Sequence, residues 1–352
     1  MTYNKTMRVL MYYSNQDVRL EQMPVPEIGP GELLMKVIAS GICGSDVMEW
    51  YRKDKVPLVL GHEVAGDVVE VGEGVEEFKP GDRVTATHHV PCNTCHYCLN
   101  GHHTVCETLL KGTHFYPGGF AEYIRIPAIN VDRGVFHIPK DVSYEKASFM
   151  EPLACVLRGQ KNARLKPGQS VLVLGSGISG LLHIALARAL GAGLVVATDT
   201  IPFRLGKAEE LGADLVLKAD ETLIDRLRQA NEGRLMDLVI ICFDGFIPLA
   251  FKSVERGGTV LFFAGAQEGA TIPATINDIF WRTEITLTST YAGAPYDCRT
   301  ALKLIGAGSV PVEKTVTHRL AMEEAPKGFQ AVCSPVEHEC VKVIVEPHRI
   351  ED

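Results

Sequence analysis

The pattern of apolar and polar residues divides the chain into two long regions with different periods. Residues 7–150 contain short β-type runs that Gly and Pro interrupt, such as 33–40, 62–72, 82–90 and 120–128. Runs of this length and composition, separated by turn residues, predict strands. The first region is therefore expected to be an all-β domain with few helices.

The pattern changes after Gln169, where apolar runs begin to alternate with amphipathic stretches. Residues 171–175 form an apolar run, and 181–191 form an amphipathic stretch that ends at a glycine. Further strands are expected at 194–199, 213–217, 237–244 and 259–265, with helices between them at 203–212, 223–233 and 249–258. This repetition predicts a parallel sheet with helices on both faces. From about residue 292 the alternation ends.

Length and charge narrow the classes of protein that the chain can be. It has 352 residues, which is long for a single core, so two domains are expected. A formal charge of −8 disfavours nucleic acid as a partner. No run of eighteen apolar residues could span a membrane, and the first sixteen residues lack the features of a signal peptide. We therefore expect a cytoplasmic protein with neither nucleic-acid nor membrane partners.

Three glycines stand at the junction of the first predicted strand and helix of the second region. Gly175, Gly177 and Gly180 have the spacing G-x-G-x-x-G, and Ile178 lies within the turn. The motif is weak alone, but after a strand and before a helix it indicates a dinucleotide site. Gly175 permits the tight turn, Gly177 lets the backbone approach a pyrophosphate, and Gly180 lets the helix pack close to the strand.

The end of the next predicted strand bears on which dinucleotide is bound. Asp199 lies nineteen residues beyond Gly180, where a carboxylate can accept the ribose hydroxyls and repel a 2′-phosphate. Arg204 argues in the other direction, because a nearby arginine can bind that phosphate. On balance the sequence favours NAD over NADP.

The segment 90–106 contains four cysteines in a C-x2-C-x2-C-x7-C pattern, namely Cys92, Cys95, Cys98 and Cys106. Four thiolates complete a tetrahedral zinc site and leave no position open for substrate, so a structural zinc is predicted. A disulfide disagrees with the expected compartment, and a redox pair does not need four members. A zinc module for nucleic acid would be basic, yet Lys111 is the only Lys or Arg between residues 86 and 118.

A second group of possible zinc ligands is dispersed along the chain. Cys43, His62, Glu63 and Glu151 lie in the segments GICGSD, LGHEVAGDVVEVG and MEPLAC. Each residue alone would be an ordinary core thiol, a satisfied histidine or a capping carboxylate. Together they offer the mixed ligands of a catalytic zinc, which needs about three protein ligands and an exchangeable position.

The sequence resembles the medium-chain, zinc-dependent alcohol dehydrogenase superfamily, in its polyol (sorbitol-like) and threonine dehydrogenase branch. The resemblance covers essentially the whole chain and rests on PGE, GICGSD, GHEVAGDVVEVG, KPGDRV, the four cysteines, GGFAEY, EPLA and GSGISG. It implies an α/β protein with a GroES-like β-rich catalytic domain and a Rossmann coenzyme domain. The catalytic domain is expected at 1–155 and 293–352, and the coenzyme domain at 156–292.

The resemblance also implies roles for particular residues. Cys43 and His62 would bind the catalytic zinc, with Glu151 as a third ligand and Glu63 as a carboxylate that can enter or leave the metal shell. Ser45 would take the proton of the alcohol. The family's next relay residue is usually a histidine three positions later, where this chain has Met48, which cannot carry a proton.

The expected activity is hydride transfer between a secondary alcohol, such as a polyol or sugar alcohol, and NAD, with two zinc ions per chain. A dehydrogenase of 3-hydroxy amino acids such as threonine is a second interpretation. A non-catalytic nucleotide-binding member of the superfamily is a third, which the retained ligand set disfavours. The resemblance also implies a homo-dimer or homo-tetramer.

Overall fold

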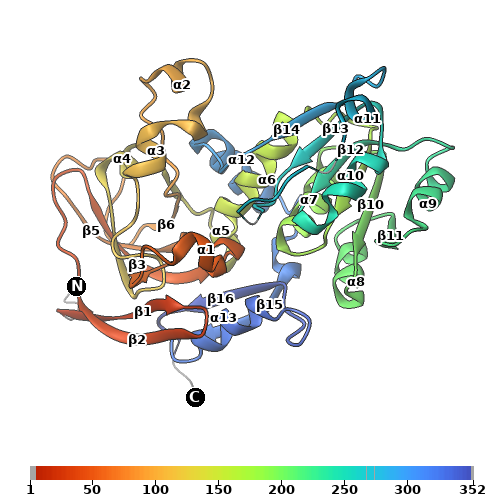
Figure 1. Cartoon of the computed structure of the whole chain (residues 1–352). Coiled ribbons are helices and arrows are strands. Elements are labelled where there is room, and N and C mark those ends of the chain that lie inside the picture. The colour runs from red at the N-terminus through yellow and green to blue at the C-terminus, as the bar shows by residue number, and fades with distance from the viewer. Residues whose placement is uncertain (1–4, 267, 273, 350–352) are drawn as a thin grey trace. The chain divides into compact units, whose positions relative to one another are not determined.

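The computed structural model describes residues 5–266, 268–272 and 274–349, and it divides into two compact units (Figure 1). The first unit comprises 1–154, 292–307 and 316–352. The second unit comprises 155–291 and 308–315. The first unit is thus assembled from three separate stretches of the chain.

The first unit is built mainly on two sheets. A three-stranded sheet has the order β2-β1-β4, and a larger sheet has the order β15-β16-β3-β5-β6-β8, with β7 paired to β3. The strands are β1 Thr6–Ser14, β2 Asp17–Pro24, β3 Leu33–Gly41, β4 Leu58–Val59, β5 Glu63–Val71, β6 Arg83–Ala86, β7 Tyr123–Ile126, β8 Val135–His137, β15 Val316–Ala321 and β16 Lys342–Glu346. β16 pairs with β3 and so brings the C-terminal stretch beside the N-terminal one.

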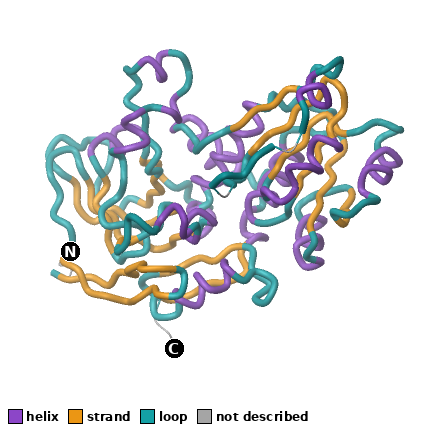
Figure 2. Tube along the Cα trace, viewed as in Figure 1, coloured by secondary structure: helices purple, strands orange, loops and turns teal. Residues whose placement is uncertain are grey.

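Helices in the N-terminal part of the first unit are short. They are η1 Gly44–Val47, α1 Glu49–Arg52, α2 His96–Leu99, η2 His103–Val105, α3 Glu107–Lys111, α4 Ala128–Arg133 and α5 Tyr144–Ser148. α12 Pro295–Gly306 and α13 Ala325–Cys333 belong to the later stretches, and α6 Met150–Asn162 runs from the first unit into the second. The first region has the expected strands, but its short helices are more numerous than the few that the sequence predicted (Figure 2).

The first unit's larger sheet is held by an apolar core on residues that alternate along its strands. Leu33, Met35 and Val37 of β3 are fully buried and pack with Val64 and Val68 of β5 in one cluster. Successive residues of a strand point to opposite faces, so this spacing puts all three β3 side chains on one face. The ends of β3 and β5 that lead to Cys43 and His62 therefore rest on a rigid frame.

The second unit is a parallel sheet with the strand order β11-β10-β9-β12-β13-β14. Its strands are β9 Ser170–Leu174, β10 Leu194–Asp199, β11 Leu215–Lys218, β12 Met236–Ile241, β13 Val254–Phe262 and β14 Thr286–Ser289. Its helices are α7 Ile178–Ala189, α8 Pro202–Glu210, α9 Leu223–Ala230, η3 Asp244–Phe246, α10 Ile247–Ser253, α11 Ile276–Phe280 and η4 Val312–Thr315. The order reverses after β9, as in doubly wound dinucleotide-binding sheets.

Two boundaries differ from the sequence-based expectation. The predicted helix at 249–258 ends at Ser253, because Val254 already pairs with Met236 as part of β13. Residues 308–315 lie in the second unit, although the sequence prediction kept them with the first. Hydrogen bonds explain this placement, since Lys207 donates to the Lys314 carbonyl and Lys314 donates to that of Glu210.

Within the described residues, no helix is both long and apolar enough to cross a membrane.

Candidate metal centres and cofactor site

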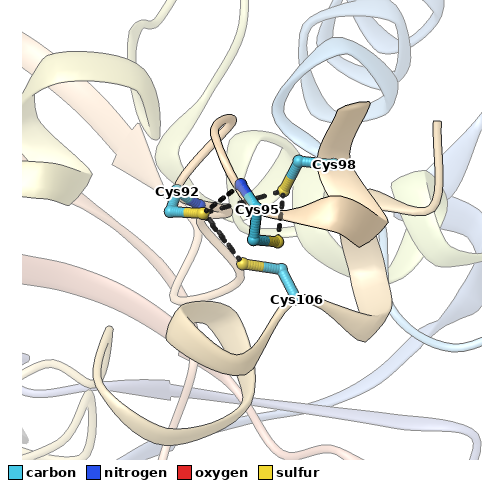
Figure 3. Close-up of side chains that lie close together, drawn as sticks. All are labelled: Cys92, Cys95, Cys98 and Cys106. Carbon is cyan, nitrogen blue, oxygen red and sulfur yellow. Dashed lines mark hydrogen bonds between the residues drawn. The ribbon is translucent and has the colours of Figure 1, made fainter. Parts of the chain in front are cut away.

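The four cysteines of the segment 90–106, here called the four-cysteine lobe, converge on one point (Figure 3). The Cys106 Sγ lies 3.5 Å from that of Cys92, and the Cys95 Sγ lies 3.5 Å from that of Cys98. The Sγ atoms of Cys92 and Cys98 are 4.0 Å apart. Sulfur atoms at about 2.3 Å from a zinc ion would be separated by nearly these distances.

Backbone N–H groups already prepare this cluster for negative charge. The amides of Thr94 and Cys95 donate to the Cys92 Sγ at 3.4 and 3.3 Å, and the amide of Cys92 donates to the Cys106 Sγ at 3.3 Å. Hydrogen bonds from Thr94 lower the pKa of Cys92 to about 5. Burial raises the pKa of Cys98 to about 12. A bound zinc ion would remove this difference in pKa between Cys92 and Cys98, because it deprotonates its thiol ligands.

Local turns rather than long-range packing place the four sulfurs. Asn93 and Gly101 have positive φ values of 64° and 81°, which bend the chain around the sulfur cluster. Cys98 and Cys106 are buried together with Leu109 in a small satellite core. Within the part of the chain that the structure describes, none of the lobe histidines belongs to a group of candidate metal ligands.

The dispersed group of Cys43, His62, Glu63 and Glu151, here called the Cys43 centre, lies entirely in the first unit. The ligand atoms of Cys43, His62 and Glu63 lie within 4.8 Å of one another. Glu151, in the first turn of α6, instead falls in a neighbouring group with His88 and His89.

The two groups adjoin. His89 Nδ1 is 3.2 Å from the Glu151 Oε1, and the rings of His62 and His88 have centroids 4.8 Å apart. Nδ1 of His88 is buried without a hydrogen-bond partner among the described residues. Burial, followed by the charges of His89 and His62, holds the pKa of His88 well below its usual value.

The loop after β3 presents Cys43 for ligation. Cys43 is the N-cap of η1, where the Ser45 amide and hydroxyl donate to its Sγ at 3.5 and 3.4 Å. The Cys43 amide donates to Asp46 Oδ2 at 3.0 Å, which closes the turn. The Cys43 sulfur is thus held in a turn that offers it to a metal, which binds cysteine as the thiolate.

Asp46 is a functional residue that the sequence reasoning missed. It is fully buried, and its Oδ1 lies 3.5 Å from His62 Nδ1 and 3.7 Å from Arg52 Nη2. Burial works to lower the pKa of His62, but the charge of Asp46 and the Cys43 thiol outweigh it and raise that pKa well above its usual value. A histidine whose Nδ1–H is held by a carboxylate presents Nε2 to a metal.

Lys342 of β16 is the second residue that was missed. Its Nζ pairs with Glu63 Oε2 and donates to the Ile42 carbonyl at 3.0 Å, and both charged side chains are about 1 % exposed. Gly41 makes room for the pair, because a Cβ there would lie 2.1 Å from the Glu63 Oε2. Burial raises the pKa of Glu63, and the Lys342 charge opposes that shift.

The glycine turn of the second unit has the geometry of an anion cradle. Gly175 has φ of 99°, and a Cβ on Gly180 would lie 1.9 Å from the Gly175 carbonyl oxygen. Gly177 is the N-cap of α7, which begins at Ile178, and a Cβ on Gly177 would meet only the Arg204 guanidinium, at 3.8 Å. The first N–H groups of α7 are therefore open to a phosphate.

Asp199 ends β10 beside this turn. Its Oδ2 accepts the Ser176 amide at 2.7 Å, and its Oδ1 accepts the amides of Thr200 and Ile201 at 2.8 and 2.9 Å. Arg204 Nη1 is 4.0 Å from the Asp199 Oδ2, and its Nε has no hydrogen-bond partner among the described residues. The carboxylate and the guanidinium thus stand side by side next to the glycine turn.

Comparisons with known proteins agree with this arrangement. Residues 29–140 match the alcohol dehydrogenase GroES-like domain, and residues 179–307 match the zinc-binding dehydrogenase family. The chain is 31% identical to sorbitol dehydrogenase of Gallus gallus, over 89% of this chain and 90% of that protein. It is 34% identical to L-threonine 3-dehydrogenase of Bacillus licheniformis, over 93% of this chain and 94% of that protein.

A solved structure extends the likeness to three dimensions. A zinc-binding dehydrogenase of Sinorhizobium meliloti 1021 with NADP bound superimposes with a TM-score of 0.85 at 29% identity, covering 98% of this chain and 100% of that one. The predicted fold class, a GroES-like domain with a Rossmann domain, is confirmed. The chain therefore belongs to the zinc-dependent medium-chain dehydrogenases, in the polyol and threonine dehydrogenase branch, and is an oxidoreductase that acts on CH–OH groups with zinc and a nicotinamide cofactor.

Proposed function

We propose that this chain transfers a hydride between a secondary hydroxyl of a polyol, or of a similarly polar alcohol, and NAD. The observation that carries the proposal is the grouping of Cys43, His62 and Glu63 within 4.8 Å, with Glu151 in the adjoining group. A thiolate, an imidazole and carboxylates together suit zinc and leave a position for substrate. The sorbitol dehydrogenases among the relatives favour a polyol.

The residues present fit two zinc ions. Cys43, His62 and Glu151 would hold a catalytic zinc, with Glu63 as an exchangeable carboxylate. The orientation of His62 by Asp46 supports this fit, because it leaves Nε2 for the metal. The four thiols of the four-cysteine lobe, within 4.8 Å of one another, would hold a structural zinc.

The protein's own side chains prepare the site for the reaction. When bound, the zinc supplies a Lewis acid that lowers the pKa of the alcohol oxygen, and the nicotinamide accepts the hydride. Asp46 faces Nδ1 of His62 at 3.5 Å and leaves Nε2 for the metal, and Lys342 balances the buried charge of Glu63. Because the charged groups are paired before substrate arrives, little reorganisation is needed during the reaction.

Ser45 is proposed to take the proton that the alcohol loses. Its hydroxyl lies 3.4 Å from the Cys43 sulfur and so stands beside a metal ligand. Met48 ends the family's usual relay, so the proton must continue through water, through the cofactor ribose or through another side chain such as His89 or Glu49.

The proposed coenzyme is NAD rather than NADP. Gly175, Gly177, Ile178 and Gly180 would receive the pyrophosphate, and Asp199 would bind the ribose hydroxyls. Arg204, 4.0 Å from that carboxylate, and the NADP in the Sinorhizobium meliloti structure support the alternative.

A 3-hydroxy amino acid such as threonine is the second candidate substrate. The observation that favours it is the 34% identity to L-threonine 3-dehydrogenase. We also propose a homo-dimer or homo-tetramer and a cytoplasmic location.

A substrate panel tests the proposal. Sugar alcohols, simple secondary alcohols and threonine should be assayed with NAD and with NADP by the absorbance of the reduced nicotinamide, beside a zinc analysis. We expect two zinc ions per chain, turnover of polyols and a preference for NAD. Turnover of threonine alone would favour the second candidate, and one zinc per chain without turnover of any alcohol would contradict the proposal.

A further inference from the structure

Cationic side chains gather beside the Cys43 centre, although the chain as a whole carries a formal charge of −8. Arg52 ends α1 and lies 3.7 Å from the Asp46 carboxylate, which in turn lies 3.5 Å from His62. Lys55 follows three residues later, with its Nζ 3.6 Å from the centroid of the Tyr51 ring. The Cζ of Arg52 is 4.8 Å from the same centroid.

The Tyr51 ring joins the two cations to the centre. Lys55 and Arg52 both lie over this ring, and Arg52 also faces the Asp46 carboxylate. After burial and His89, the charges of both cations contribute to the lowered pKa of His114.

The acidic groups of the centre already have basic partners. Glu63 pairs with Lys342, and Glu151 with His89. Asp46 lies against His62 and Arg52, as described above. Among the described residues, no carboxylate pairs with Lys55, and its neighbour Asp54 is exposed without a partner. The exposed Lys55 is therefore a cation near the centre that no described carboxylate pairs with.

Arg52 is held so that one edge of its guanidinium stays available. Nε and Nη2 donate to the Ser45 carbonyl at 3.2 and 3.1 Å, and Nη2 also faces Asp46. Nη1 makes no hydrogen bond within the described ranges, and 13% of the side chain is exposed. An arginine fixed in this way is suited to carboxylate or phosphate, because little side-chain entropy is lost when it binds.

We propose that the substrate carries an anionic group, a carboxylate or a phosphate, which Arg52 and Lys55 bind while the hydroxyl to be oxidised lies at the Cys43 centre. This inference rests on the proposed function and narrows its substrate from polyols in general to acidic ones. The unpartnered Nδ1 of His88, whose ring lies 4.8 Å from that of His62, adds a polar contact for an oxygen-rich substrate. A neutral polyol would gain nothing from the charges of Arg52 and Lys55, whereas an anionic group would be attracted by them.

Three compounds with one carbon skeleton provide the test: glucitol, gluconate and glucitol 6-phosphate. With NAD and zinc-loaded protein, we expect kcat/KM for at least one of the two acids to exceed that for glucitol about tenfold or more. The acid that is preferred distinguishes carboxylate from phosphate. The KM for the acid should rise as ionic strength increases from 0.05 to about 0.5 M, whereas the KM for glucitol should not, because salt screens only the charged substrate.

Three variants and one control locate the effect. Lys55→Gln should raise KM for the preferred acid about tenfold without changing kcat for it, and should leave the KM for glucitol unchanged. Arg52→Gln should raise the same KM about a hundredfold, and Arg52→Lys should recover only part of that loss, because lysine lacks the planar fork. Lys53→Gln removes an exposed lysine two residues from Lys55 and should change none of these constants.

Calorimetric titration of gluconate and of inorganic phosphate into the complex with zinc and NADH, which cannot accept a hydride, makes the test independent of turnover. Binding that Lys55→Gln and Arg52→Gln weaken supports the inference. If neither anion binds more tightly to the wild type than to both variants, and glucitol is turned over as well as the acids, the inference is wrong while the proposed dehydrogenase function stands. Absence of turnover of every alcohol counts against the proposed function alone.

Discussion

The four-cysteine lobe and the Cys43 centre contain similar ligands but are built in opposite ways. The lobe takes its four sulfurs from one stretch of seventeen residues, and its own turns and amides bring them together. The four ligands proposed for the centre come from positions 43 to 151, and strands, a helix and a buried lysine of β16 hold them. Metal ligands that lie close together in a sequence therefore indicate a metal that stabilises a loop. The ligands of a reactive metal can lie far apart in the sequence, and the fold brings them together.

The largest expected effect comes from removing a ligand of the Cys43 centre. Cys43→Ser should lower kcat at least about 10³-fold, because the loss of several kcal/mol of Lewis-acid stabilisation acts directly on the barrier. Zinc should fall from two ions to one per chain, with the melting temperature nearly unchanged. Zinc analysis, steady-state kinetics and calorimetry measure the three quantities. Cys333→Ser, at an exposed cysteine, is the matched control.

A cysteine-to-serine substitution in the four-cysteine lobe should lower the stability of the protein and leave kcat nearly unchanged. Cys106→Ser removes a fully buried ligand and should lower the melting temperature by roughly 10 °C, because a structural zinc contributes folding energy. The kcat per folded molecule should change less than about threefold. A fall of kcat comparable to that of Cys43→Ser would mean that the lobe takes part in the reaction, and the comparison would fail.

The coenzyme site extends the comparison, since its residues are also dispersed. Asp199→Ala should raise KM for NAD about thirtyfold and KM for NADP by much less, because the carboxylate attracts the ribose hydroxyls and repels a 2′-phosphate. Steady-state titrations with both coenzymes measure this. Asp225→Ala, at an exposed aspartate of α9, should leave both constants unchanged. If KM rises equally for NAD and NADP, Asp199 does not select the coenzyme. It would then only support the glycine turn, through its hydrogen bond from the Ser176 amide.

A smaller effect is expected from the proton-accepting residue. Ser45→Ala should lower kcat about tenfold and should change the dependence of kcat on pH, because one proton path is removed. Rates measured from pH 6 to pH 10 show the change. An unaltered profile would mean that Ser45 serves only as a donor to the Cys43 sulfur.

The smallest effect concerns a buried histidine outside both metal sites. Burial lowers the pKa of His183 to about 3, far below its value of about 6.5 in the unfolded chain. As the pH falls below 6.5, His183 therefore binds a proton in the unfolded chain but not in the folded one. The free energy of unfolding is highest above pH 6.5 and falls by about 1.4 kcal/mol per pH unit below it. His183→Gln should flatten this dependence between pH 6.5 and pH 4.5 in denaturant titrations. The same change at the exposed His102 should not alter the slope.

The features that the sequence could predict are those whose residues lie close together in the chain, as in the four-cysteine lobe. The lobe and the glycine turn were predictable because their ligands, turns and amides are neighbours in the chain. The alternation after Gln169 was predictable because burial on both faces makes the strands of a parallel sheet continuously apolar. The helix expected at 249–258 was too long, because LAFKSVE continues a helical pattern past the point where pairing with β12 begins.

The partners of the Cys43 centre could not be predicted in this way. Asp46 is an ordinary acidic residue in a loop until the fold buries it beside His62. Lys342 stands in a run of apolar residues 279 positions after Glu63, and nothing local distinguishes it from a surface lysine at a strand edge. Their identification needs the pairing of β16 with β3, which is a long-range contact.

The pair of Lys342 and Glu63 also sets an order of events during synthesis. The first stretch of the first unit leaves the ribosome long before β16 does, and the whole second unit is made in between. Until β16 arrives, the nascent chain holds Glu63 next to an apolar frame without its counter-ion, and burying that charge alone is costly. The charge of Glu63 can therefore be matched only after β16 has been synthesised.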